Sequence, residues 1–146
     1  MEHLKIRTLK AEDLPALARL YTQFWGQDSD LPKMRATYEE IAPDPRHILL
    51  CATVDEVVVA SILGVICQEL YRECRPFLVV EDLIVDGGFR RKGIGKRLMN
   101  ELLTRARRRG CGQVQFITET SREEAIAFYR SQGYDPGLHV GFKKTL

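Results

Sequence analysis

The chain has 146 residues, of which 45% are hydrophobic and 29% are charged. This balance is that of an ordinary globular domain and excludes an intrinsically disordered chain. The longest apolar run, residues 57–67, is too short to span a bilayer, and the first ten residues lack the apolar core of a signal peptide. We therefore expect one domain over residues 1–146, located in the cytoplasm.

The net charge of +2 conceals an uneven distribution of charge. Residues 86–109 hold nine basic and two acidic side chains, which leaves 13 of the 22 basic and 18 of the 20 acidic residues elsewhere. This segment is therefore suited to binding an anion. The four cysteines form no CxxC pair, and Cys51 and Cys67 sit in apolar runs, which favours reduced thiols over disulfides. The three histidines are scattered, so no metal site is expected.

The hydrophobic pattern predicts six strands and four helices. In chain order they are a strand at 3–8, helices at 14–25 and 33–41, strands at 48–54, 57–68 and 77–85, a helix at 94–109, a strand at 113–118, a helix at 123–131 and a strand at 139–144. Asp13 is placed to cap the first helix. This order predicts a mixed α/β fold in which helices pack on one sheet.

Two adjacent carboxylates, Glu81 and Asp82, interrupt an otherwise apolar strand and need a reason to be there. Strand alternation would point their side chains to opposite faces of the sheet.

The stretch GFRRKGIGKRL, residues 88–98, predicts an anion site where a strand meets a helix. The first N–H groups of a helix have no partner within it, and its dipole places partial positive charge there. Gly93 and Gly95 remove side chains that would hold a ligand away from this backbone. A nucleoside triphosphate loop and a dinucleotide-binding loop are both excluded, because Arg90 and Leu98 stand at positions where those motifs require glycine.

Two motifs give this sequence a family resemblance. Residues 90–95, RRKGIG, match the pattern [QR]-x-x-G-x-[GA], and residues 125–134, AIAFYRSQGY, resemble A-x-x-F-Y-x-x-x-G-[FY]. Both patterns are typical of the GNAT superfamily of N-acetyltransferases. The resemblance implies a GNAT fold, with one central, mostly antiparallel sheet of six to seven strands, a splayed strand pair and about four flanking helices. Residues 81–86, EDLIVD, are locally similar to glucosamine-6-phosphate acetyltransferases.

The same resemblance implies that acetyl-CoA is the cosubstrate and that no metal takes part. Backbone groups of Leu83, Ile84 and Val85 would pair with the pantetheine arm and the acetyl carbonyl. Arg122 stands where many members carry an asparagine that contacts pantetheine, so either it reaches a CoA phosphate or that contact is missing. The pyrophosphate would lie on the loop formed by Arg90, Arg91, Lys92, Gly93, Ile94, Gly95 and Lys96.

By the same resemblance, Tyr129 would protonate the departing thiolate, and Asp82 or Glu81 would take the proton of the amine. A backbone N–H near Val85 would bind the oxyanion. Each assignment has a structural alternative. Tyr129 sits on an apolar helical face and could be a core residue, and either carboxylate could instead pair with an arginine or attract a cationic substrate.

The acceptor is expected to be a primary amine on a small molecule or peptide, such as an amino sugar, a polyamine, an aminoglycoside or a lysine side chain. In this fold the first two helices and their loop shape the acceptor site. The residues concerned are Trp25, Gln27, Asp28, Asp30 and Tyr38, of which the two aspartates could equally be solvated loop residues.

Two other classes of function compete with an enzyme. One is an acyl-CoA-binding sensor without turnover. The other is a nucleic-acid-binding protein, which the basic run at 105–109 invites but the lack of nearby aromatic side chains disfavours. No membrane partner is expected, and the sequence does not decide between a monomer and a homodimer.

Overall fold

A computed structural model describes residues 3–146. These residues form two compact units that divide after Gln115. The first unit contains, in chain order, β1 (Leu4–Thr8), α1 (Leu14–Trp25), α2 (Leu31–Ile41), β2 (His47–Val54), β3 (Val57–Cys67), β4 (Phe77–Val85), α3 (Ile94–Arg108) and β5 (Val114–Gln115). The second unit contains α4 (Glu123–Ser131). Single 3₁₀ turns at Ala11–Asp13 and Gly87–Phe89 precede α1 and α3.

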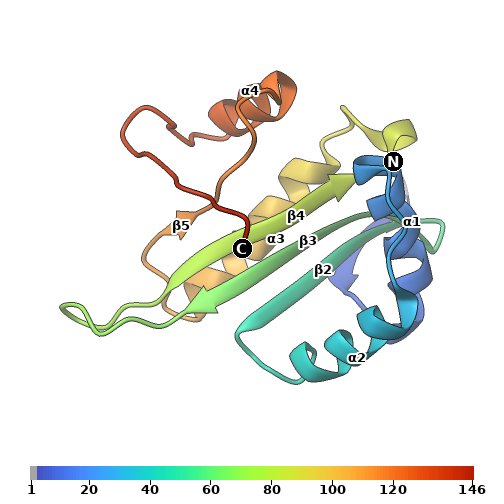
Figure 1. The fold of residues 1–146 in the computed structure, drawn as a ribbon, viewed down its shortest axis with the longest axis horizontal. Coiled ribbons are helices and arrows are strands. Elements are labelled where there is room, and N and C mark those ends of the chain that lie inside the picture. The colour runs from blue at the N-terminus through green and yellow to red at the C-terminus, as the bar shows by residue number, and fades with distance from the viewer. Residues whose placement is uncertain (1–2) are drawn as a thin grey trace. The chain divides into compact units, whose positions relative to one another are not determined.

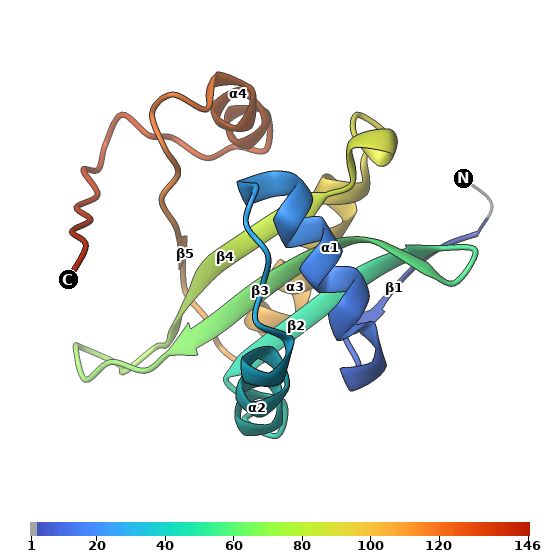
Figure 2. The same cartoon turned by 45° about the vertical axis from the view of Figure 1, so that its right-hand side comes forward.

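One sheet organises the first unit, with its strands in the order β1-β2-β3-β4-β5. The first four strands are antiparallel to their neighbours, whereas β5 runs parallel to β4 and pairs with it only through Leu78–Val114 and Val79–Gln115. Helices α1 and α2 cover one face of the sheet and α3 covers the other (Figures 1 and 2).

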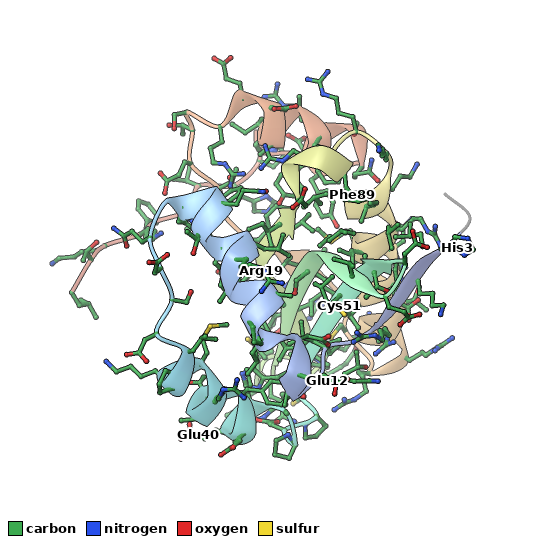
Figure 3. The ribbon with its side chains drawn as sticks, turned by 90° about the vertical axis from the view of Figure 1, so that its right-hand side faces the viewer. His3, Glu12, Arg19, Glu40, Cys51 and Phe89 are labelled. Atoms are coloured by element: carbon green, nitrogen blue, oxygen red, sulfur yellow. The ribbon has the colours of Figure 1, made fainter. Side chains whose placement is uncertain are left out.

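Each face of the sheet has its own packed core. On the α1 face, leucines from α1 meet Cys51 of β2 and Ile84 of β4, all of them buried. On the α3 face, Gly64 of β3 lets α3 approach closely, because a Cβ at this position would lie 2.5 Å from Leu102 Cδ1. Figure 3 views the α1 face, with Arg19 and Glu40 on the exposed sides of their helices.

Most of the predicted elements are confirmed within one or two residues, including all four helices. Helix α2 begins at Leu31 rather than residue 33, since Pro32 is accepted in a first turn and Asp30 Oδ1 accepts the Lys33 N–H at 3.1 Å.

The predicted count of six to seven strands is wrong, because the described residues contain five. Only Val114–Gln115 of the predicted strand at 113–118 is paired. Residues 139–144 form no strand, and Val140 and Phe142 remain 79% and 91% exposed. Alternation alone does not make a strand, since each strand needs a neighbouring edge to satisfy its backbone.

Asp13 is the N-cap residue of α1, as predicted, but its side chain does not cap the helix. Its carboxylate faces β1 instead. Arg7 donates two hydrogen bonds to it, at 2.6 and 2.9 Å, and the backbone N–H of Lys10 donates a third at 2.7 Å. The Asp13 side chain is only 8% exposed, and the Arg7 guanidinium holds the pKa of its carboxyl below the usual range. The pair therefore ties β1 to the start of α1.

We expect Asp13→Asn to lower the free energy of unfolding at pH 7 by about 1–3 kcal/mol, because it leaves the Arg7 guanidinium without its counter-charge. Because the native pKa of Asp13 is lowered, this stabilisation is complete above the ordinary aspartate value of about 3.9 and is lost as the pH falls through the native value. Urea unfolding at several pH values measures both effects. The control is Glu12→Gln, whose exposed carboxylate lies 4.0 Å from Lys10, and an equal loss in the two variants would contradict the prediction.

Candidate functional site

Strand β4 carries a bulge at Asp82, in the middle of the predicted site. Glu81 pairs with Leu63 and Ile84 pairs with Ser61, so a single residue of β3 lies opposite Asp82 and Leu83. Asp82 has a φ of +54°, a left-handed conformation that aspartate tolerates better than most residues. The strict alternation of the strand therefore stops at Asp82, and the prediction that Glu81 and Asp82 lie on opposite faces loses its basis.

Beyond its first residues, β4 has one open edge. One edge is bonded to β3 as far as Val85, which pairs with Ala60. The other edge pairs with β5 only at Leu78 and Val79, so over residues 80–85 it has no partner strand among residues 3–146. Backbone groups on such an edge require partners, and an extended ligand can supply them. Leu83, Ile84 and Val85, the predicted pantetheine residues, all lie on this stretch.

The loop after β4 leads to the N-terminus of α3 through two left-handed residues, Arg91 (φ +60°) and Gly93 (φ +78°). Gly93 is the N-cap residue of α3, and a Cβ placed there would meet nothing within 4 Å. The backbone N–H groups of Ile94, Gly95 and Lys96 make no hydrogen bond to any residue in the described part of the chain. The first N–H groups of α3 thus lack a hydrogen-bond partner within the described residues, and free N–H groups at a helix N-terminus are the arrangement that binds a phosphate group.

The basic side chains of this loop are arranged in different ways. Arg90 folds back, and its Nε donates to the Val85 carbonyl at 3.2 Å. Lys92 places its Nζ 5.2 Å from the centre of the Phe89 ring, a cation–π contact. Lys96 and Arg97 are exposed in the first turn of α3. Arg90 therefore stabilises the end of β4 through this hydrogen bond. Lys96 and Arg97 add positive charge near the N–H groups that lack a hydrogen-bond partner.

Gln23 of α1 holds the start of this loop, a role that the sequence analysis missed. Its Oε1 accepts the Gly87 N–H at 2.9 Å, and its Nε2 lies 3.4 Å from Asp86 Oδ2. Asp86 also accepts the Gly88 N–H at 2.8 Å through its other oxygen. The sequence Asp-Gly-Gly carries a signal for this turn, since aspartate commonly accepts the N–H two residues ahead. No local signal marks Gln23, which lies 63 residues away from Asp86.

We expect Gln23→Met to weaken acetyl-CoA binding about 3- to 10-fold, because it removes two hydrogen bonds that fix the loop without changing the size of the side chain much. Isothermal titration calorimetry with acetyl-CoA alone measures the effect. Gln27→Met is the matched control, since Gln27 is an exposed glutamine just beyond α1 that makes no hydrogen bond to the described residues. Equal affinities in the two variants would show that the Gln23 contact does not position the loop.

The two carboxylates of β4 differ in their surroundings. Glu81 is exposed, whereas Asp82 is partly buried, and burial raises the pKa of its carboxyl. Asp82 makes no hydrogen bond or ion pair with the described residues, so its burial is not offset by a partner. Its charge acts on Tyr21 of α1, whose pKa is raised by burial first and by Asp82 second. Tyr21 is a further polar group near Asp82 that the sequence analysis did not single out.

Tyr129 and Arg122 belong to the second unit. Tyr129 lies on α4 within a cluster of rings, with centroids 4.5 Å from Phe116, 5.3 Å from Phe128 and 6.1 Å from Tyr134. Burial raises the pKa of the Tyr129 hydroxyl, although the positive charge of Arg122 partly opposes this. Arg122 is the N-cap residue of α4. Tyr129 therefore stays protonated at neutral pH, as a proton donor must.

Some of the residues predicted to shape the acceptor site make contacts that stabilise the fold, whereas others are exposed and could contact an acceptor. Asp30 caps α2, and the Tyr38 hydroxyl donates to the Leu9 carbonyl at 3.1 Å, so both have structural roles. Asp28 accepts a hydrogen bond from Thr22 at 3.3 Å, and Gln27 is exposed. Trp25 packs edge-on against Tyr21 and Phe24 and is still 52% exposed. Trp25 and Gln27 are therefore the residues of this set that are most available to an acceptor.

Among residues 3–146, no cluster of three or more histidine, cysteine or acidic side chains is arranged to bind a metal ion. Over the same residues, no helix has the length and apolarity needed to cross a membrane. Cys51 is buried, and burial raises the pKa of its thiol to about 11.

Comparison with known proteins identifies the family. The model of the acetyltransferase (GNAT) family matches residues 14–134, and the chain belongs to this family. It is 32% identical over 136 residues to an uncharacterized protein of Mycobacterium leprae, covering 92% of this chain but only 35% of that protein. It is 30% identical over 141 residues to glucosamine 6-phosphate N-acetyltransferase 1 of Oryza sativa subsp. japonica, covering 91% of this chain and 82% of that one.

Solved structures share the fold. Glucosamine-6-phosphate N-acetyltransferase from Arabidopsis thaliana superposes with a TM-score of 0.85 at 23% identity, over 97% of each chain. An aminoglycoside acetyltransferase from an uncultured soil metagenomic sample, solved in complex with sisomicin, superposes with a TM-score of 0.82 at 24% identity, over 99% of this chain and 97% of that one. At these identities the likeness is one of fold. The fold is thus a GNAT fold with one mostly antiparallel sheet and four helices.

Proposed function

We propose that this chain is an N-acetyltransferase that moves an acetyl group from acetyl-CoA to the primary amine of an acceptor, by direct attack in a ternary complex. The observation that carries the proposal is the open edge of β4, followed along the chain by the N-terminus of α3, whose first N–H groups have no hydrogen-bond partner within the described residues. An extended pantetheine arm fits the first feature and a pyrophosphate fits the second. Family membership supports the same cosubstrate.

The residues that would hold acetyl-CoA follow from this fit. The N–H groups between Arg91 and Lys96 would bind the pyrophosphate, and Leu83 to Val85 would pair with the pantetheine arm. When bound, acetyl-CoA supplies the thioester carbonyl that the amine attacks. Holding the two reactants together accounts for much of the expected acceleration. Arg122 is proposed to contact a CoA phosphate.

The proton transfers are assigned to Asp82 and Tyr129. Asp82 is proposed to accept the proton of the attacking amine, directly or through a water molecule, because it is the partly buried carboxylate of the pair and forms no ion pair with residues 3–146. Tyr129 is proposed to donate a proton to the departing thiolate, an assignment that rests on its place in the family motif and on its raised pKa. A backbone N–H near Val85 would polarise the acetyl carbonyl.

We propose one domain over residues 1–146 as the catalytic unit, with an amino sugar as the first acceptor to test. The support for this acceptor is the rice glucosamine 6-phosphate acetyltransferase, which this chain matches over 82% of its length. We further propose that the protein acts in the cytoplasm.

The test is thiol release from acetyl-CoA across a panel of amines, namely glucosamine 6-phosphate, an aminoglycoside, a polyamine and a lysine peptide. We expect coenzyme A to be released above the rate without amine for at least one of them. Tight acetyl-CoA binding without turnover of any amine would instead favour a sensor. Loss of acetyl-CoA binding altogether would remove the basis of the proposal.

A further inference from the structure

A basic cleft lies at the C-terminal end of α3, whereas the loop proposed to bind the pyrophosphate, residues 90–96, lies at the N-terminal end. A cleft of about 300 Å³ opens where the last turn of α3 meets the end of β1 and the start of β2. Helix α3 has 15 residues, so its two ends are about 20 Å apart. Figure 1 shows α3 running behind the sheet toward the end at which β2 begins. The residues lining the cleft are Thr8, His47, Ile48, Leu49, Arg105, Arg108 and Arg109.

Helical spacing explains why three arginines reach this cleft. Arg105, Arg108 and Arg109 stand at positions i, i+3 and i+4, which share one face of a helix. Arg107, in the same turn, does not line the cleft. A favourable interaction with the helix dipole accounts for basic residues in the last turn of α3, but not for their gathering around a common cavity.

Two of the three guanidinium groups are held in place by the protein. Arg105 Nε donates to Glu101 at 2.9 Å, and a second nitrogen donates to Thr8 Oγ1 at 3.1 Å. Arg109 donates to the Pro45 carbonyl at 2.6 Å. Each guanidinium has five N–H donors, so both keep donors for a ligand.

The positive charge in the cleft exceeds its protein counter-charges. Arg108 makes no hydrogen bond or ion pair within residues 3–146, and Glu101 pairs only with Arg105. The Asp44 carboxylate, which lies 3.4 Å from His47 Nδ1, pairs with Arg46 at 2.9 Å. Like charges at this spacing on a helix repel each other, and a bound anion would relieve the repulsion.

We propose that this cleft binds a phosphate group, either as inorganic phosphate or on a small phosphate ester, at a site separate from that of acetyl-CoA. Guanidinium groups match the oxygens of phosphate in two-point hydrogen bonds, and Thr8 adds a hydroxyl. The cleft volume is at the lower limit for a small-molecule site, which suits such a ligand. Arg108 is expected to donate hydrogen bonds to the phosphate, since it is the one of the three arginines that has no partner within the described residues.

The test titrates inorganic phosphate into the full chain saturated with coenzyme A, so that phosphate cannot compete at the N-terminus of α3. Chloride keeps the ionic strength constant. We expect a saturable rise in Tm, together with saturable NMR shifts at Thr8 and His47. Arg108→Gln is expected to weaken the phosphate affinity about 10-fold or more, and the matched control Arg107→Gln to leave it unchanged.

Two results would overturn the proposal. One is the lack of a saturable response to phosphate in the unmodified protein. The other is an equal affinity in Arg108→Gln and Arg107→Gln, which would place the bound phosphate elsewhere. Neither result affects the proposed acetyl transfer, because that activity is measured separately by thiol release.

Discussion

Replacing Tyr129 by phenylalanine is expected to lower kcat at neutral pH by about 10²-fold or more, with little change in the affinity for acetyl-CoA. Tyr129 is proposed to protonate the departing thiolate, and phenylalanine has no proton to give. Burial raises the pKa of this hydroxyl, so the residue stays protonated and ready to donate across the neutral range. The ring contacts with Phe116 and Phe128 do not need the hydroxyl, and the variant is therefore expected to fold normally.

The measurement is kcat with the best amine from the panel, together with the dissociation constant of acetyl-CoA. Tyr134→Phe is the control, because it removes a hydroxyl from the same group of rings, 6.1 Å from Tyr129. A large loss of kcat in both variants would indicate damage to the ring cluster rather than a lost proton donor. An unchanged kcat in Tyr129→Phe would remove this residue from the mechanism.

The sequence predicted correctly the elements whose structure depends on residues close together in the chain. The apolar stripe of α3, the tight turn between β2 and β3 and the glycine-rich loop are all determined by residues close together in the chain. The loop that we propose binds the pyrophosphate could be predicted for this reason, since the left-handed Gly93 and the helix that follows it are encoded within a few residues.

Long-range contacts decided the features that the sequence analysis missed or misplaced. Arg7 binds Asp13 across the end of β1 and diverts its carboxylate from the expected cap. The bulge at Asp82 arises from the pairing of β4 with β3, which alternation within β4 cannot reveal. The predicted strand at 139–144 likewise lacks a paired edge, whatever its own pattern favours. Such contacts depend on which elements pack or pair with one another in the folded protein, and the local pattern of a single sequence does not specify these pairings.

The surroundings of the two carboxylates at the bulge favour Asp82 over Glu81 as the general base, because Asp82 is partly buried and Glu81 is exposed. We expect Asp82→Asn to lower kcat/KM for the amine by about 10²-fold, the usual contribution of a general base, since the amide cannot accept the proton. Glu81→Gln, one residue away, is the matched control and is expected to have a small effect. Asparagine has nearly the same shape as aspartate, so the fold should be retained.

The pH profile gives an independent readout of the role of Asp82. Burial disfavours the charged carboxylate and raises its pKa, so the base form is lost on acidification at a pH above the ordinary aspartate value of about 3.9. In the unmodified enzyme, the log of kcat/KM should therefore fall as the pH is lowered through the pKa of Asp82. In Asp82→Asn this fall should be absent, whereas any fall caused by protonation of the amine should remain. If Glu81→Gln instead abolishes the fall assigned to Asp82, Glu81 is the base, and the partly buried Asp82 serves to attract the cationic acceptor.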